Sequence, residues 1–178
     1  MLEIYVPSYE YYINEEFVNS KAVTIKLEHS LVAISKWESR FEKPFLSDSD
    51  KTEEELYYYI KCMITNPEDI DEYTINSLTN TQLFEIRDYI GSRQTATTVR
   101  LNNKKSQKEI MTSEVLYYLM IANNIPFECQ NWHINRLVTL INVCQAKNQT
   151  PKKQNPNDVL SKNRALNEAR KKARNTSG

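Results

Sequence analysis

The stretch IPFECQNWHINRLVTLINVCQAKN, residues 125–148, decides the organisation predicted for this chain. Beyond residue 131 its apolar side chains recur at helical spacing and wrap more than one face, which is typical of the central helix of a domain. The sequence then changes to PKKQNPNDVLSKNRALNEARKKARNTSG, residues 151–178, where apolar side chains are sparse. We therefore predict a globular body over residues 1–150 and a C-terminal arm over residues 151–178.

Charge separates the same two parts of the chain. Lys and Arg number 23 in the whole sequence, and so do Asp and Glu. The arm holds eight of the cations and two of the acids, which leaves 15 cations and 21 acids in the body. The net charge of zero is thus −6 in an acidic body and +6 in a basic arm. Such asymmetry indicates interaction with a partner and says nothing about fold.

Composition excludes several classes of protein. A chain of 178 residues with a mean hydropathy of −0.63 fits one domain with an extension. No apolar run approaches the roughly 18 residues of a membrane helix, and the start of the chain lacks a secretory signal. We therefore expect a cytosolic protein with no membrane partner. Only Gly91 and Gly178 are glycines, too few for Walker, Rossmann or nucleophile-elbow motifs. The widely spaced cysteines Cys62, Cys129 and Cys144 fit reduced thiols.

The body is predicted to begin with a small β element over residues 1–28 and to continue as a helical core over residues 29–150. Segments 2–7 and 22–27 alternate apolar and polar side chains, as the strands of a hairpin or small sheet do. From residue 29 up to Pro44, the apolar side chains recur at helical spacing.

Local signals place further helices in this core. Thr52 with Glu55 and Thr79 with Gln82 have the spacing of capping boxes, so each pair predicts a helix start. Gly91 stands where a C-terminal cap of the second of these helices belongs.

Residues 92–108 lack a core pattern and predict an exposed loop, or a weak hairpin around residues 99–101. A further helix is expected from Thr112 or Ser113 to the Asn-Asn-x-Pro sequence that ends at Pro126. The predicted fold class is therefore α+β and predominantly α-helical. It has a small N-terminal hairpin or sheet, five or six helices and a basic C-terminal helix.

The residues predicted to form the structural core of the body are Trp37, Trp132, His133, Leu137 and Ile141. Cys129 and His133, with Glu128 and Cys144 near them in sequence, also suggest a metal or Cys-His nucleophile site. The packed-core interpretation is favoured because no close Cys-x-x-Cys or His-x-x-x-His pair accompanies them. We assign no catalytic residue, no metal ligand and no cofactor, and expect no enzyme.

The arm is predicted to form a helix over residues 157–174 with a thin apolar stripe on a basic cylinder. Such a helix is only marginally stable in water when it is isolated. The arm allows four interpretations. It could be a surface helix exposed to solvent, or it could bind phosphates, a membrane or a groove in a protein. The stripe favours docking in a protein groove, and the lack of Trp and Phe disfavours a membrane. The residues predicted to bind the partner are Leu160, Arg164, Leu166, Arg170, Lys171, Lys172 and Arg174.

Three segments carry a resemblance to a known group of proteins. They are LEHSLVAISKWESRFEKPFL (27–46), SEVLYYLMIANNIPFECQNWHINRLVTLINVC (113–144) and SKNRALNEARKKARNTSG (161–178). They resemble siphophage proteins encoded just before the tape measure, a group associated with tail assembly chaperones of phages of Gram-positive bacteria. The Trp-His-Ile-Asn-Arg-Leu segment is the most specific part.

This resemblance implies a non-enzymatic chaperone that binds and solubilises the tape measure protein during tail assembly. Its location would be the host cytoplasm, and it would be absent from the mature virion. It also implies self-assembly into a homo-oligomer and a longer, frameshifted form of the protein as partners. The residues themselves are also compatible with two other functions. They are a nucleic-acid-binding phage protein that uses the basic arm and a structural or connector protein of the virion.

Overall fold

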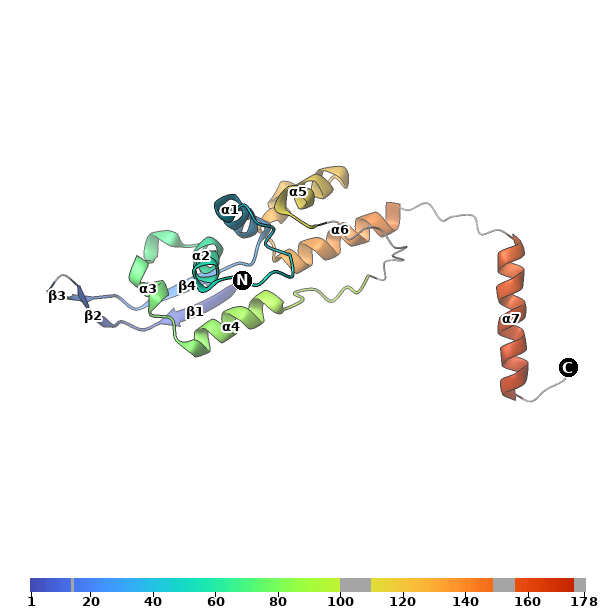
Figure 1. The fold of residues 1–178 in the computed structure, drawn as a ribbon, viewed down its shortest axis with the longest axis horizontal. Coiled ribbons are helices and arrows are strands. Elements are labelled where there is room, and N and C mark those ends of the chain that lie inside the picture. The colour runs from blue at the N-terminus through green and yellow to red at the C-terminus, as the bar shows by residue number, and fades with distance from the viewer. Residues whose placement is uncertain (14, 100–109, 149–155, 175–178) are drawn as a thin grey trace. The chain divides into compact units, whose positions relative to one another are not determined.

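The computed structural model describes residues 1–13, 15–99, 110–148 and 156–174 (Figure 1). The chain falls into two compact units, Met1–Ala146 and Lys147–Gly178. The predicted boundary between residues 150 and 151 lies outside the described residues. Seven α-helices and four short strands fall within the described parts, so the fold is α+β and mostly helical, which confirms the predicted class.

The elements follow in the order β1 (Leu2–Val6), β2 (Glu10–Ile13), β3 (Glu16–Asn19), β4 (Val23–Leu27), α1 (Leu31–Phe41), α2 (Glu53–Met63), η1 (Pro67–Asp69), α3 (Glu72–Asn76), α4 (Asn80–Gly91), α5 (Ser113–Ala122), η2 (Phe127–Asn131), α6 (Ile134–Asn148) and α7 (Pro156–Arg174). The elements η1 and η2 are single 3₁₀ helices.

The first 27 residues form a long hairpin in two antiparallel sections. β1 pairs with β4, and β2 pairs with β3 nearer the turn. Between the sections, the backbone N–H of Ser20 donates to the carbonyl of Tyr9 at 2.9 Å. Ile4 and Ile25 face each other in the register and are buried, because alternate residues of each strand point to the same face. The predicted outer strands are confirmed, whereas β2 and β3 were not predicted.

The core of the body lies on one face of the β1–β4 pair. α2 packs against β4 and α4 against β1, and α1 packs against α2, α5 and η2 (Figure 1). The side chain of Ser30 caps α1 by accepting the N–H of Ala33. Trp37 is fully buried, and its indole N–H donates to the carbonyl of Glu55 at 2.9 Å. The predicted capping boxes of α2 and α4 are both present, which confirms these helix starts.

The prediction that residues 131–148 form the central helix is wrong. α6 buries Ile134, Leu137 and Ile141 in its first half, but Cys144 is only half-buried and residues 146–148 are exposed. α1 takes the central position, because it packs against helical elements on several sides.

The predicted role of Gly91 as the C-terminal cap of α4 is also wrong. Gly91 is the last residue of α4, and its φ is not positive. Ser92 is the cap, and both its N–H and its hydroxyl donate to the carbonyl of Tyr89, at 3.1 and 2.6 Å. This bonding satisfies an end carbonyl of the helix, so a left-handed residue is not required. Residues 93–99 contain no helix or strand, and the rest of the suggested hairpin lies outside the described residues.

Candidate functional site

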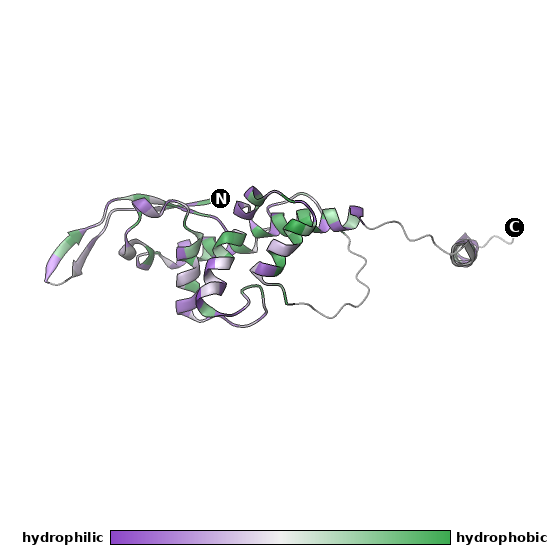
Figure 2. Cartoon of the chain, turned by 90° about the horizontal axis from the view of Figure 1, so that it is seen from above, coloured by the Kyte–Doolittle hydropathy of each residue, from purple (hydrophilic) through white to green (hydrophobic). Residues whose placement is uncertain are grey.

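The predicted partner-binding residues lie on α7, and every one of them is exposed. Leu160 and Leu166 are 58% and 52% exposed. Figure 2 shows α7 as predominantly hydrophilic, in contrast with the green residues in the helices of the body. The seven residues are Leu160, Arg164, Leu166, Arg170, Lys171, Lys172 and Arg174.

These seven residues do not share one face of the helix. Successive residues of an α-helix are about 100° apart, so Leu160 and Leu166 point in directions about 120° apart. Leu166 lines up instead with Ala169 and Ala173, at positions i, i+3 and i+7, and Arg170 flanks that row. We call Leu166, Ala169, Ala173 and Arg170 the arm stripe.

A second exposed surface lies in the body, on α5 and η2. Tyr118, Ile121 and Phe127 are 67%, 60% and 53% exposed. Tyr117 is half-buried, and its ring centroid lies 6.4 Å from that of Phe127. Because Ile121 is one turn from both tyrosines, the four side chains form one apolar surface. We call Tyr117, Tyr118, Ile121 and Phe127 the α5–η2 patch.

The start of α5 is held by two side chains. The hydroxyl of Thr112 accepts the N–H of Val115 at 3.4 Å and caps the helix. The buried carboxylate of Glu38, on α1, accepts the N–H of Ser113 at 2.7 Å. An acidic group at this end of a helix is stabilised by the helix dipole. α1 therefore fixes where α5 begins.

A Schellman turn sets the angle between α5 and η2. Asn124 has a φ of 52°, and Ile125 and Asn124 donate their N–H groups to the carbonyls of Met120 and Ile121, at 2.9 and 3.1 Å. This bonding pattern is typical of such a motif. Ile125 is then buried, and Pro126 follows. The Tyr117 hydroxyl also donates to the Gln130 side chain at 3.0 Å. These bonds fix the orientation of η2 relative to α5.

The charged side chains of the segment that carries the α5–η2 patch are acidic. Between residues 110 and 135 the sequence contains no Lys or Arg. Its two acids, Glu114 and Glu128, are both exposed. Hydrogen bonds from the backbone at the start of α5 lower the pKa of Glu114, so its carboxylate stays ionised at neutral pH. An apolar surface with two carboxylates on the same elements suits a partner that carries apolar and basic side chains.

The patch was not predicted. The sequence predicts the helix from Thr112 or Ser113 onward, but it does not predict that the side chains of Tyr118 and Ile121 on this helix are exposed. The available signal was the composition of α5 itself. A helix that is apolar nearly all round must be buried on every side or must offer one face to a partner.

The predicted core residues lie in the body. Trp37, His133, Leu137 and Ile141 are buried. Trp132 is half-buried, and the guanidinium of Arg136 lies 4.0 Å from its ring centroid.

A buried polar cluster joins the end of β4 to the starts of α1 and α6. The carbonyl of His29 accepts the N–H of Ile134 at 2.7 Å. The rings of His29 and His133 are 4.9 Å apart and nearly perpendicular. His29 Nδ1 also forms a hydrogen bond with the hydroxyl of Tyr59. This cluster ties residues far apart in the sequence to one point.

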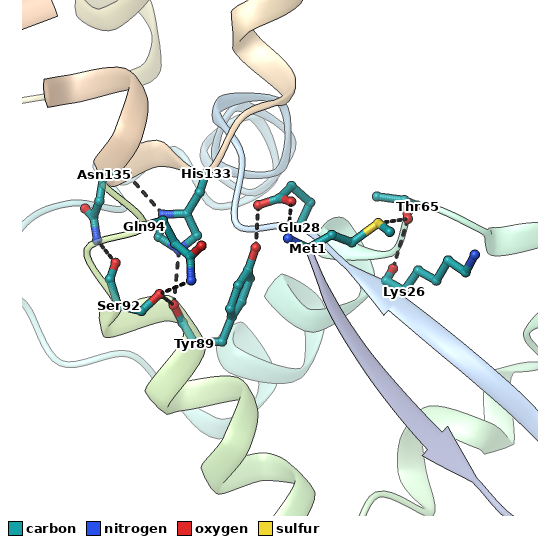
Figure 3. Close-up of polar contacts among 9 residues, drawn as sticks. All are labelled: Met1, Lys26, Glu28, Thr65, Tyr89, Ser92, Gln94, His133 and Asn135. Carbon is teal, nitrogen blue, oxygen red and sulfur yellow. Dashed lines mark hydrogen bonds and ion pairs between the residues drawn. The ribbon is translucent and has the colours of Figure 1, made fainter. Parts of the chain in front are cut away.

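His133 is held as a neutral imidazole. Its Nδ1 accepts the N–H of Asn135 at 3.3 Å, which leaves Nε2 to donate to the carbonyl of Tyr89 at 3.1 Å (Figure 3). The Tyr89 hydroxyl donates to Glu28 at 2.6 Å, and Glu28 also pairs with the terminal amine of Met1.

Burial is the main cause of the pKa shifts in this cluster. It lowers the pKa of His29 from 6.5 to about 3, and the neighbouring His133 adds to the effect. Burial also lowers the pKa of His133, and it raises that of Tyr59 well above its usual value. These groups are committed to structural contacts. Within the described residues, no group of three or more His, Cys, Asp and Glu is placed to hold a metal ion.

Comparison of the chain with family models, with curated proteins and with solved structures gives no match. None of the helices in the described parts is long and apolar enough to cross a membrane.

Proposed function

We propose that this protein is a non-enzymatic phage tail assembly chaperone that binds and solubilises the tape measure protein during tail assembly. The observation that carries the proposal is the α5–η2 patch. It offers three large side chains of α5 and η2, each more than half exposed. The patch also lies within residues 113–144, a segment that resembles the chaperone group.

The chemistry of such a client fits this surface. A tape measure is a long helical chain whose apolar faces aggregate when they are exposed. A helix that lays its apolar side chains against Tyr118, Ile121 and Phe127 would hide that surface from water. The predicted residues of α7 would add contacts from a second unit of the same chain. The protein would act in the host cytoplasm and leave before the virion is complete.

Co-expression with the tape measure protein encoded downstream tests this proposal. We expect the client to be soluble with the wild-type protein and insoluble without it. The double variant Tyr118→Ser/Ile121→Ser should leave the client insoluble. Phe84→Ser is the matched control, because Phe84 is 70% exposed on α4, outside the patch. Equal melting temperatures of the two variants would show that both fold. A client that is soluble without the protein contradicts the proposal.

The basic end of α7 supports one rival function. Lys171, Lys172 and Arg174 lie in its last turn, where they could contact phosphates. If the protein binds nucleic acid, its affinity for a DNA duplex should fall steeply with salt. Absence of DNA binding at low salt would remove this rival. Mass spectrometry of purified virions separates a chaperone, which should be missing, from a connector protein.

A further inference from the structure

We propose that His133 is a pH-sensitive latch, whose protonation releases the start of α6 from the rest of the body. The latch is a helix cap that can take up a proton. It lies within the unit Met1–Ala146. The inference does not depend on the identity of the client or on the proposed function.

His133 occupies the cap position of α6. Its carbonyl accepts the N–H groups of Arg136 and Leu137, at 2.9 and 3.1 Å. Its ring Nδ1 accepts the N–H of Asn135, the second residue of the helix, at 3.3 Å (Figure 3). Side chains at this position satisfy the free N–H groups of the first helical turn, usually with an oxygen of Ser, Thr, Asp or Asn. Here the acceptor is a ring nitrogen, which can be protonated.

A proton on Nδ1 removes this cap. Nε2 already carries a hydrogen, because it donates to the carbonyl of Tyr89, so Nδ1 is the nitrogen that takes the added proton. The protonated Nδ1 then faces the N–H of Asn135 as a second donor. The cation also lies at the N-terminal end of α6, where the helix dipole disfavours positive charge. Both effects destabilise the first turn of α6.

The groups packed around His133 do not compensate for this charge. Burial has the largest effect and lowers the pKa of His133, while the carbonyl of Tyr89 and the charge of Glu28 act against the shift. The two oxygens of Glu28 are already bonded to the Tyr89 hydroxyl and to the amine of Met1, and that amine also disfavours a protonated His133. The ring of His29, from the connection between β4 and α1, is buried 4.9 Å from the ring of His133.

Two further bonds attach the start of α6 to its neighbours. The N–H of Ile134 donates to the carbonyl of His29 at 2.7 Å, and the side-chain amide of Asn135 donates to the carbonyl of Ser92 at 2.7 Å. Both donors belong to the two residues that follow His133, so loss of the cap weakens both attachments. Ile134 is buried when the latch is closed, and opening would uncover it.

The direction of the pH effect follows from proton binding. The closed body holds the ring of His133 neutral, whereas the opened segment exposes the ring, which then binds a proton below about pH 6.5. The open form therefore binds more protons, and opening becomes easier as the pH falls below that value. The gain is at most about tenfold for each pH unit.

Amide hydrogen exchange of the full-length protein, at pH 7 and pH 5.5, tests the latch. The protection factor corrects for the direct effect of pH on exchange, so it reports opening. His133→Asn keeps a capping side chain that cannot titrate in this range. We expect the protection of Ile134 and Asn135 to fall about tenfold more in the wild type than in this variant. His133→Ser gives the same comparison if His133→Asn does not fold.

A reference amide and a third variant complete the test. The amide of Ile60, buried in α2, should be better protected than that of Ile134 at both pH values, because the start of α6 opens by itself. His133→Ala has no capping atom, so at pH 7 its Asn135 amide should be about fivefold less protected than in His133→Asn. Equal falls in the wild type and His133→Asn overturn the inference, and so does equal protection of Ile134 and Ile60 at both pH values.

Discussion

The carboxylate of Glu38 accepts the backbone N–H of Ser113 at 2.7 Å, across 75 positions of sequence. Its other oxygen accepts the N–H of Phe45 at 2.8 Å. One buried side chain of α1 therefore holds both the loop that follows α1 and the start of α5. The α5–η2 patch depends on this bond for its place on the body.

Replacing Glu38 with Ala should destabilise the body. The N–H groups of Ser113 and Phe45 would lose their partner in a buried place, and each such loss costs about 1–3 kcal/mol. We expect the free energy of unfolding in urea to fall by about 2–4 kcal/mol. Glu54→Ala is the control, because Glu54 is exposed in the first turn of α2. Equal stabilities of the two variants would contradict this role of Glu38.

Acid should destabilise the body through His29. The folded chain holds this ring neutral, with a pKa near 3, while the unfolded chain binds a proton below about pH 6.5. The unfolded state therefore binds more protons between these values, and stability falls as the pH falls through that window. For this residue alone the loss at pH 5 is about 2 kcal/mol.

Urea unfolding of the wild type and of His29→Gln, at pH 7.5 and pH 5, measures this contribution. The variant cannot take up the proton, so its stability should drop by about 2 kcal/mol less between the two pH values. An equal drop in the two proteins would show that His29 is not the group responsible.

Asn66 should stabilise the outer edge of β4. Its side-chain oxygen accepts the N–H of Lys26 at 2.9 Å, and its amide donates to the carbonyl of Thr24 at 3.0 Å. The side chain thus takes the place of a neighbouring strand. Asn66→Ala should cost about 1–2 kcal/mol, with faster amide exchange at Lys26. Asn80→Ala, at the exposed start of α4, should change neither quantity.

Deleting the residues after Asn155 should leave a folded body. The body, Met1–Ala146, is a compact unit by itself and contains the buried hydrophobic residues of the described chain, so the deletion removes none of them. The melting temperature of the truncated chain should stay within about 2 °C of the wild type. Collapse of its near-ultraviolet circular dichroism would show that the arm belongs to the core.

The sequence predicts best those features that local chemistry controls. The capping boxes at Thr52 and Thr79 satisfy helix N–H groups within four residues, so they are readable without tertiary information. The outer strands of the hairpin alternate because one face is buried. β3 is exposed on both faces, so it leaves no such pattern. α3 has only five residues, too few for a helical period.

The sequence predicts least well what packing decides. The apolar stripe of α6 shows that a side of this helix can be buried, but how much of it is buried depends on the elements that pack against it. Likewise, Ile121 and Leu116 are both aliphatic, yet the first is exposed and the second is buried. The packing of α5 against α1, the bond from Glu38 and the turn at Asn124 together determine which face of α5 points outward.

The bond between the carbonyl of His29 and the N–H of Ile134 has a consequence for the order of folding. The long hairpin and the α1–α2 pair join near neighbours in sequence, so both can form early. The body closes only when the start of α6 has been made, because α6 must return to the end of β4. Until then, the end of β4 and the start of α1 lack this partner, so that part of the core is open to other chains during synthesis.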